Sequence, residues 1–446
     1  MPFRHQGFDT MRRHRQTTTR VPTVHGPVVV RPRARHTMLR TGLLGVAVFG
    51  LLAACATGPG STAGSDRSTG SSGVAQPAAT PESTPEQTPT VALTPNVTPD
   101  SPVAIDTVVS VKATDGTISS VALTYKDTKS VEQTVQGSIS PDADTWTAES
   151  LLEPNTKYSL AMTGLSADGT THSSTSTFST QNLSAKQQIT ARISQNGGTV
   201  GVAMPVVVRF DVPVKDKAAF ERKMTVTSDP AQPGSWAWYG SSEVHWRPVT
   251  YWQPGTKVTV KVDVNSVPAG GGTYGKASVT GGFTVGGSLT MKADLKAHQL
   301  YVTIGGKLAR TIPITGGKPG MESRSGTKVI LEKSPQVIMD SETIGISKDN
   351  PDYYRLDVRW AMRETTSGEF LHAAPWSVGS QGVANVSHGC IGMSTANAEW
   401  LFAQVKIGDP VTVTGTGRSL ERGNGWTDWN VSFDEFKKYS ALNAAA

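Results

Sequence analysis

Two histidines and one cysteine near the C-terminal end of the sequence have residue types and spacing suited to acyl transfer. His372 opens the segment His372-Ala373-Ala374-Pro375-Trp376, and Ser387-His388-Gly389-Cys390 follows it after a short interval. A cysteine thiolate is a strong nucleophile, and a nearby imidazole can take its proton. A glycine before the cysteine permits a sharp turn, from which backbone amides can face a developing oxyanion. The pattern indicates a Cys390 nucleophile with a histidine base, and leaves open a buried, inert cysteine with incidental histidines.

The number and separation of the cysteines exclude two classes of protein. The chain has 446 residues and two cysteines, Cys55 and Cys390. Two cysteines so far apart exclude a disulfide-rich scaffold and a structural zinc site made of cysteines. The length exceeds that of a usual single domain, so we expect more than one hydrophobic core.

Positive charge is concentrated at the N-terminus. The formal net charge is +6, but residues 1–54 hold nine arginines and one aspartate, a balance of +8. The other residues carry 33 basic and 35 acidic side chains, a balance of −2. A nucleic-acid-binding protein needs a basic face on its folded part, so we expect no nucleic-acid partner.

The N-terminal segment, residues 1–54, has the pattern of an export signal. Arginines precede a short apolar run over residues 43–54, which ends at Cys55 and is too short to span a membrane comfortably. Leu52-Ala53-Ala54-Cys55 resembles a bacterial lipobox, which implies an acylated Cys55 as the first mature residue. An ordinary signal peptide with an unmodified Cys55 is the alternative. We predict an exported protein, anchored by lipid at Cys55 to the outer face of the cytoplasmic membrane and acting in the cell wall. The segment before the apolar run is unusually long for a signal peptide, and translation from Met38 would give one of ordinary length.

Residues 55–100 predict a disordered tether. The stretch is dominated by Gly, Ser, Thr, Ala and Pro and contains no aromatic residue, so it cannot build a core.

The folded part is predicted to be mainly β. Short alternating strands with Gly, Asp and Asn turns indicate two immunoglobulin-like (Ig-like) sandwiches, over residues 101–183 and 184–286. Residues 153–160 match residues 253–260 at a separation of 100, which is one such domain. The tryptophans of these modules are interpreted as core or interdomain packing.

A third, β-rich module with a mixed sheet is predicted over residues 287–414. Strands at 300–304 and 308–314 are separated by Gly305-Gly306-Lys307, a hairpin signal. Residues 394–405 predict its one prominent helix, since apolar residues recur there at helical spacing after a Ser or Thr cap. Residues 415–446 include Trp426, Trp429, Phe433 and Phe436 and predict a C-terminal helical tail that packs on a neighbouring domain.

The catalytic motif resembles that of the L,D-transpeptidases, which have a YkuD-type catalytic domain. The tandem Ig-like modules and lipobox resemble the mycobacterial lipoprotein branch of that family. The resemblance implies a cysteine nucleophile that attacks a peptidoglycan tetrapeptide stem, releases D-Ala, and passes the thioester to a diaminopimelate amine of another stem. The product is a 3→3 cross-link, and carbapenems are implied as covalent inhibitors.

Roles follow residue by residue from this resemblance. It implies Cys390 as nucleophile and His372 as general base, oriented by the carbonyl of Ala373. Amides at Gly389 and Cys390 would form the oxyanion hole, with His388 as a shaping residue or, as the alternative, the general base. Further implied assisting or substrate contacts are Tyr354 and Met339 at a lid, Ser367 and Gly368 on a strand edge, Gly392, and Trp376, although packing is the simpler role for Trp360, Trp376 and Trp400.

Two positions depart from the family pattern. Relatives usually carry Asn where this chain has Gly392, and many carry Ser where it has Ala373. A calcium loop found in some relatives would fall at residues 267–272, which hold no carboxylate, so we predict no metal and no cofactor. A water-using L,D-carboxypeptidase and a catalytically weak cell-wall scaffold remain the alternatives.

Overall fold

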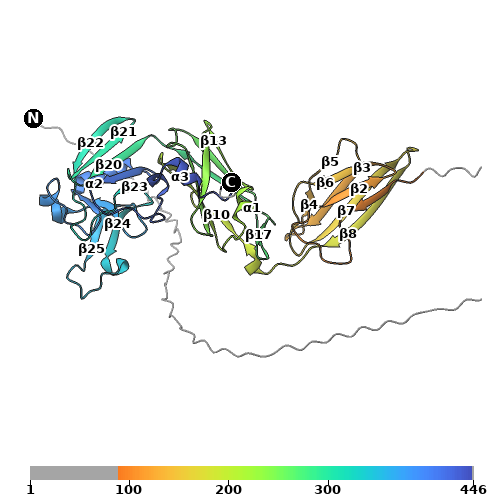
Figure 1. Cartoon of the computed structure of the whole chain (residues 1–446), viewed down its shortest axis with the longest axis horizontal. Helices are drawn as coiled ribbons and strands as arrows, with labels where there is room; N and C mark the ends of the chain where they lie inside the picture. Colours follow the sequence, from red (N-terminus) through yellow and green to blue (C-terminus); the bar gives the residue numbers. More distant parts are fainter. Residues whose placement is uncertain (1–88, 444–446) are drawn as a thin grey trace, which may run out of the picture. The chain divides into compact units, whose positions relative to one another are not determined.

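The computed structural model describes residues 89–443 (Figure 1). The predicted signal, Cys55 and most of the predicted tether lie outside this range. Strands dominate the described part and helices are few and short, which confirms a mainly β fold. Within residues 89–443, no helix is long and apolar enough to cross a membrane.

The first module is a sandwich of two antiparallel sheets around one core (orange to yellow in Figure 1). One sheet has the order β1-β2-β6-β5: Ala92–Pro95, Ser110–Thr114, Thr145–Ala148 and Gly137–Ile139. The other has the order β4-β3-β7-β8: Glu132–Val135, Gly116–Lys126, Lys157–Ser166 and Thr171–Ser179.

Strand β1 lies inside the stretch predicted to be tether, so that prediction is wrong for its last residues. Leu93 pairs with Ala113 of β2, and Val91 and Val97 are buried in the core of the module. The composition of the stretch hid these apolar residues among prolines and threonines.

The second module has a larger core and three sheets. The first is β10 (Ala191–Ile193), β12 (Val206–Phe210), β15 (Glu243–Pro248) and β14 (Gly234–Trp238). The second is β11 (Thr199–Val200), β19 (Val279–Val285), β16 (Lys257–Val262) and β13 (Met224–Asp229), and the third is β17 (Pro268–Gly270), β18 (Thr273–Gly275) and β9 (Gln188–Ile189). Short helices η1 (Ala185–Gln187) and α1 (Lys217–Glu221) complete it.

The repeat seen in the sequence marks equivalent points of the two modules. Strands β7 and β16 begin at Lys157 and Lys257, each after a left-handed residue, Asn155 at φ 50° and Gly255 at φ 85°. The tryptophans of these modules are buried in the cores, as predicted: Trp146, Trp236, Trp238, Trp246 and Trp252.

The third module combines a five-stranded and a four-stranded sheet around its own core. The five-stranded sheet has the order β22 (Lys307–Pro313), β21 (Gln299–Ile304), β20 (Leu289–Asp294), β28 (Pro410–Thr414) and β23 (Gly326–Val329). The other has the order β24 (Glu332–Asp340), β25 (Arg355–Arg363), β26 (Phe370–Ala373) and β27 (Ile391–Met393). Helices η2 (Ser341–Ile344) and η3 (Pro375–Ser380) lie in its loops.

Both local predictions for this module are confirmed. Strands β21 and β22 form the antiparallel hairpin. Helix α2 spans Thr395–Gln404, with the hydroxyl of Ser394 accepting from the amide of Asn397, and it buries Ala398 and Leu401. The helix packs on β25 and β26, the strands that lead to the functional site.

The C-terminal tail packs on the second module, as predicted. It contains η4 (Asp428–Asn430) and α3 (Phe433–Lys437). Trp429 donates its indole hydrogen to the carbonyl of Ala203 at 2.7 Å, and the guanidinium of Arg247 lies over the rings of Trp429 and Phe436.

Candidate active site

Parallel pairing of β26 and β27 brings His372 and Cys390 to one place. His372 lies opposite Gly392 in the register, and Cys390 directly precedes β27. Both residues line a cavity of about 290 Å³. The structure therefore joins the two residues that the sequence proposed as base and nucleophile.

The turn before Cys390 is built by Ser387. Its hydroxyl donates to the carbonyl of Cys390 at 2.6 Å and accepts from the amide of Gly389 at 3.1 Å. Gly389 has φ of +124°, which side-chain-bearing residues rarely adopt. Because its amide is already bonded to Ser387, the predicted role of Gly389 as an oxyanion donor does not hold in this conformation.

The imidazole of His372 is buried and has a fixed orientation. Its Nδ1 lies 2.8 Å from the carbonyl oxygen of Ala373, as the resemblance implied. A carbonyl can only accept, so Nδ1 carries the hydrogen and Nε2 is left as the proton acceptor. Burial lowers the pKa of His372 below its ordinary value, so the ring is neutral and able to act as a base.

The thiol of Cys390 rests in its protonated form. Burial raises its pKa to about 12. The thiol donates to the carbonyl of Gly368 at 3.7 Å. In the described part of the chain it makes no hydrogen bond with His372. Attack on a substrate therefore requires the thiol to turn toward the imidazole and lose its proton there.

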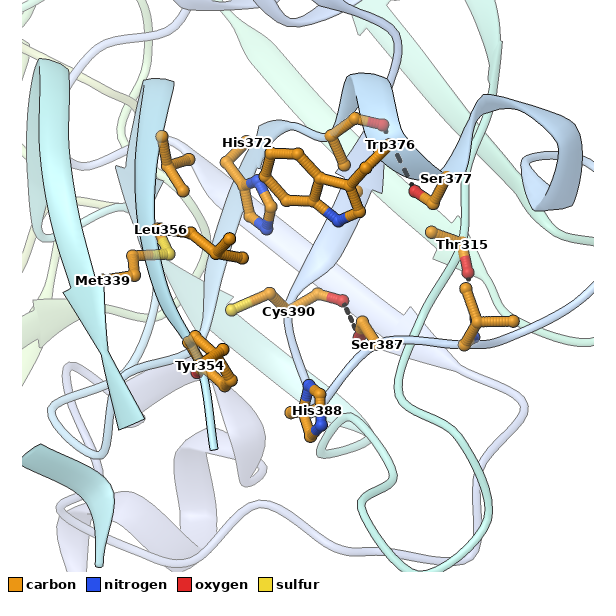
Figure 2. A pocket seen from close by; sticks show the side chains of 14 residues that line it. Thr315, Met339, Tyr354, Leu356, His372, Trp376, Ser377, Ser387, His388 and Cys390 are labelled. Carbon is orange, nitrogen blue, oxygen red and sulfur yellow. Dashed lines mark hydrogen bonds between the residues drawn. The ribbon is translucent and has the colours of Figure 1, made fainter. Parts of the chain in front are cut away.

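Figure 2 shows Cys390 in the middle of the cavity, with His372 and Trp376 on one side and Tyr354 and His388 on the other. Trp376 is 54% exposed and its ring stacks 6.0 Å from that of His372, so the packing role considered for it is wrong. By contrast, Trp360 packs on Phe402, and Trp400 lies under Arg310, as expected for packing residues.

The segment between β24 and β25 ends at Tyr354 and begins just after Met339, so both residues flank the predicted lid. Met339 lies in β24, opposite Leu356, and lines the cavity. Burial, and next the proximity of Cys390, raise the pKa of Tyr354 to about 12, so its phenol stays protonated.

His388 connects this segment to the turn of the nucleophile. Its ring lies 5.0 Å from that of Tyr354, and its Nε2 lies 3.4 Å from Oδ1 of Asp352. The same carboxylate pairs with Lys318. These contacts fit the shaping role predicted for His388, but no motif in the sequence marks Asp352 or Lys318.

Ser367 and Gly368 lie in the turn between β25 and β26, and their predicted position on a strand edge is wrong. Strand β25 ends at Arg363 and β26 begins at Phe370, and Gly368 between them has φ of +99°. Their contact with substrate stays a prediction; both line a second cavity, of about 720 Å³, which shares Met339 and Tyr354 with the first.

Of the two departures from the family pattern, Gly392 lines the cavity and Ala373 directly follows His372 in β26. A Cβ added at Gly392 would come within 2.8 Å of Cβ of Ala374 and 3.2 Å of Cγ2 of Thr315. Ala374 and Thr315 therefore occupy the space that a side chain at position 392 would need, so a glycine fits there. Ala373 still supplies its backbone carbonyl to His372.

A buried ion cluster lies behind the nucleophile. The Lys328 ammonium contacts Glu364 at 2.7 Å and Glu369 at 2.5 Å, and Arg324 pairs with Glu369 at 2.7 Å. A Cβ on Gly389 would lie 3.6 Å from the carboxylate of Glu369, so the cluster borders the catalytic turn. Among residues 89–443, no group of three or more metal-ligating side chains is close enough to hold an ion.

A cysteine and an oriented, neutral histidine on one cavity define the class of thiol-dependent acyl-transfer sites. Comparisons with known proteins identify the family. Residues 290–413 match the model of the L,D-transpeptidase catalytic domain, and residues 100–268 match that of a bacterial Ig domain.

Relatives agree over most of the chain. L,D-transpeptidase 2 of Mycobacterium tuberculosis is 34% identical over 76% of this chain and 82% of its own, and L,D-transpeptidase 5 of the same species is 35% identical over 75% and 73%. A solved structure of LdtMt1 in complex with imipenem is 41% identical over 50% of this chain and 97% of that one, with a TM-score of 0.45. The chain belongs to the L,D-transpeptidase family.

Proposed function

We propose that this chain is an exported, lipid-anchored L,D-transpeptidase that forms 3→3 peptidoglycan cross-links through a thioester on Cys390. The observation that carries the proposal is the hydrogen bond from Nδ1 of His372 to the Ala373 carbonyl. This bond leaves Nε2 as a proton acceptor at the cavity that Cys390 also lines.

The first half of the reaction makes the acyl-enzyme. His372 takes the thiol proton while sulfur attacks the carbonyl carbon between diaminopimelate and D-Ala of a tetrapeptide donor. The tetrahedral intermediate collapses as its C–N bond breaks, and His372 returns the proton to the leaving amine of D-Ala. The diaminopimelate carbonyl is then bound to Cys390 as a thioester.

The second half transfers the acyl group. The side-chain amine of diaminopimelate on another stem loses a proton to His372 and attacks the thioester carbonyl. The C–S bond breaks, the thiolate recovers the proton, and a 3→3 amide results. Water in place of the amine would release a tripeptide and make the enzyme an L,D-carboxypeptidase.

Carbapenems are proposed to acylate the same thiol. Attack of Cys390 on the β-lactam carbonyl would open the ring and give a thioester, like the one formed with a peptide stem. The imipenem complex of LdtMt1, a protein of the same family, supports this part of the proposal.

Export and anchoring rest on the N-terminal sequence. Acylation of Cys55 would hold the enzyme at the outer face of the membrane, next to the cell wall. Cys55→Ser is then expected to move the protein from the membrane fraction to the soluble extracellular fraction; an unchanged distribution would contradict the anchor.

Product analysis tests the reaction. The full chain is incubated with tetrapeptide-containing muropeptides, beside Cys390→Ala as the matched control. Dimers with a diaminopimelate-to-diaminopimelate bond, formed by wild type only, are expected. Tripeptides without dimers would assign the carboxypeptidase instead, and no product would favour the scaffold.

A further inference from the structure

The turn between β25 and β26 is held by one side chain of the C-terminal extension, Asn424. Its Oδ1 accepts from the amide of Ser367 at 2.9 Å and from the hydroxyl of Thr366 at 3.0 Å. Its Nδ2 donates to the hydroxyl of Ser367 at 2.9 Å. Both ends of one amide group therefore bind the tip of this turn.

The same turn supplies the hydrogen-bond acceptor of the nucleophile. The carbonyl of Gly368, the residue after Ser367, accepts from the thiol of Cys390 at 3.7 Å. A Cβ on Gly368 would lie 3.1 Å from Cγ2 of Ile344 in the lid segment, so the glycine fits closely there. A shift of the turn would move this carbonyl relative to the thiol.

Within the turn, the hydroxyl of Thr365 shares a hydrogen bond with the hydroxyl of Ser367 at 3.2 Å, and the carbonyl of Thr365 accepts from the amide of Gly368 at 3.4 Å. The hydroxyl of Thr365 accepts from the amide of Glu369 at 2.8 Å. Thr366 and Ser367 are exposed, and three hydrogen bonds with Asn424 hold them from outside the turn. Asn424 supplies that contact from 57 residues away in sequence.

Asn424 is itself fixed by its neighbours. Glu421 pairs with Arg324 at 2.6 Å and accepts from Nδ2 of Asn424 at 3.1 Å. Arg422 donates to the carbonyl of Trp238 at 2.9 Å, and its guanidinium lies over the ring of Tyr239. Glu421 thus holds the side chain of Asn424, and Arg422 ties the same segment to the second module.

We propose that Asn424 is a positioning residue for the nucleophile, acting through the Gly368 carbonyl that holds the Cys390 thiol in its resting orientation. The inference rests on the proposed function only in taking Cys390 as the reacting thiol. The carbonyl accepts a hydrogen that the thiolate lacks, so it favours the neutral thiol. Release of the turn therefore eases ionisation of Cys390.

The test is the pH profile of Cys390 alkylation by iodoacetamide in the full chain, read by peptide mass spectrometry so that Cys55 is counted separately. Asn424→Ala is expected to alkylate roughly fivefold faster near neutral pH, with a profile shifted to lower pH, as expected for loss of one hydrogen bond. This variant replaces none of the titratable groups around the thiol: Lys328, Glu364, Glu369, Arg324, Tyr354, His372 and His388. Besides the bonds to the turn, it removes the bond to Glu421, the partner of Arg324.

Asn430→Ala is the matched control. Asn430 lies in the same extension and accepts from the amide of Thr327 at 3.0 Å, but it binds β23 and not the turn. Its profile is expected to follow wild type. If Asn424→Ala does not fold, Thr366→Val removes one bond of the same contact and should shift the profile in the same direction by less.

Identical profiles for wild type, Asn430→Ala and a folded Asn424→Ala or Thr366→Val would overturn the inference. Acylation of wild type by a carbapenem is measured in parallel. Its absence would count against the proposed function, whereas the alkylation profiles test the positioning role in either case.

Discussion

Nδ1 of His372 donates to the carbonyl oxygen of the next residue, Ala373, at 2.8 Å. One backbone acceptor thus sets the tautomer of the base and leaves Nε2 free for the proton of Cys390. The side chain at position 373 takes no part in this bond. For this reason, replacement of the usual serine by alanine leaves the orientation of the base intact.

The fall of the acylation rate at acid pH is expected to follow protonation of the His372 imidazole. Burial lowers its pKa from the ordinary value of 6.5, so the midpoint of its protonation lies below pH 6.5. The rate of carbapenem acylation should fall as pH falls, with its half-maximal point below pH 6.5. Stopped-flow measurement between pH 4 and 8 checks this.

The variant Asp352→Asn tests whether the acid limb of that pH profile belongs to His372 or to His388. It removes the carboxylate beside His388 and leaves the surroundings of His372 unchanged. The acid limb should keep its position in this variant. A displaced limb would assign it to His388.

Gly392→Asn, which restores the usual family residue, is expected to destabilise the protein and not to improve it. The new Cβ would lie 2.8 Å from that of Ala374, and overpacking of this kind costs about 1–3 kcal/mol. Denaturant unfolding measures the loss. Gly379→Asn is the control, because a Cβ there meets open space; equal stability of both variants would refute the steric argument.

Lys328→Met should lower the free energy of unfolding by about 3–5 kcal/mol. The substitution leaves Glu364 and Glu369 buried without their shared cation. Burial opposes the charge of Lys328, but the two glutamates outweigh it and raise its pKa. Lys307→Met, at an exposed position of the β21–β22 hairpin, should change stability little in the same unfolding assay.

The contact between β15 and the C-terminal extension is expected to weaken at alkaline pH. Burial alone would lower the pKa of His245, but Asp428 and Glu243 outweigh it and raise that pKa to about 9. The stabilisation is complete below the unfolded value of 6.5 and is lost as pH rises through about 9. At 1.36 kcal/mol for each pKa unit, it amounts to at most about 3 kcal/mol.

Unfolding free energies at pH 6 and 9.5 measure this loss. The difference between wild type and His245→Gln isolates the histidine from other titrating groups such as Tyr239, which bonds Asp428 at 3.2 Å. A difference between the two proteins that does not change with pH would contradict a charged His245.

Local sequence signals predicted much of the fold. The hairpin of β21 and β22, helix α2, and the equivalent strands at Lys157 and Lys257 follow from turn residues, helical spacing and an internal repeat. The motif around Cys390 and His372 predicted the centre of the site because its residue types are specific to the chemistry.

The rest depended on long-range contacts that residue types do not encode. The Gly368 carbonyl that binds the thiol is a backbone atom, and Asn424 reaches its turn from a distant segment. The bond from Gly389 to Ser387 and the exposure of Trp376 likewise arise from the tertiary structure. Strand β1 was missed because few apolar residues mark it in a proline-rich stretch.

Intact-protein mass spectrometry of the full chain tests the central claim most directly. Wild type is incubated with a tetrapeptide stem or a carbapenem, with Cys390→Ala as the control, and peptide mapping locates any adduct. The account predicts a single acyl adduct on Cys390 in wild type and none in the variant. No adduct in wild type, or the same adduct in both proteins, would contradict it.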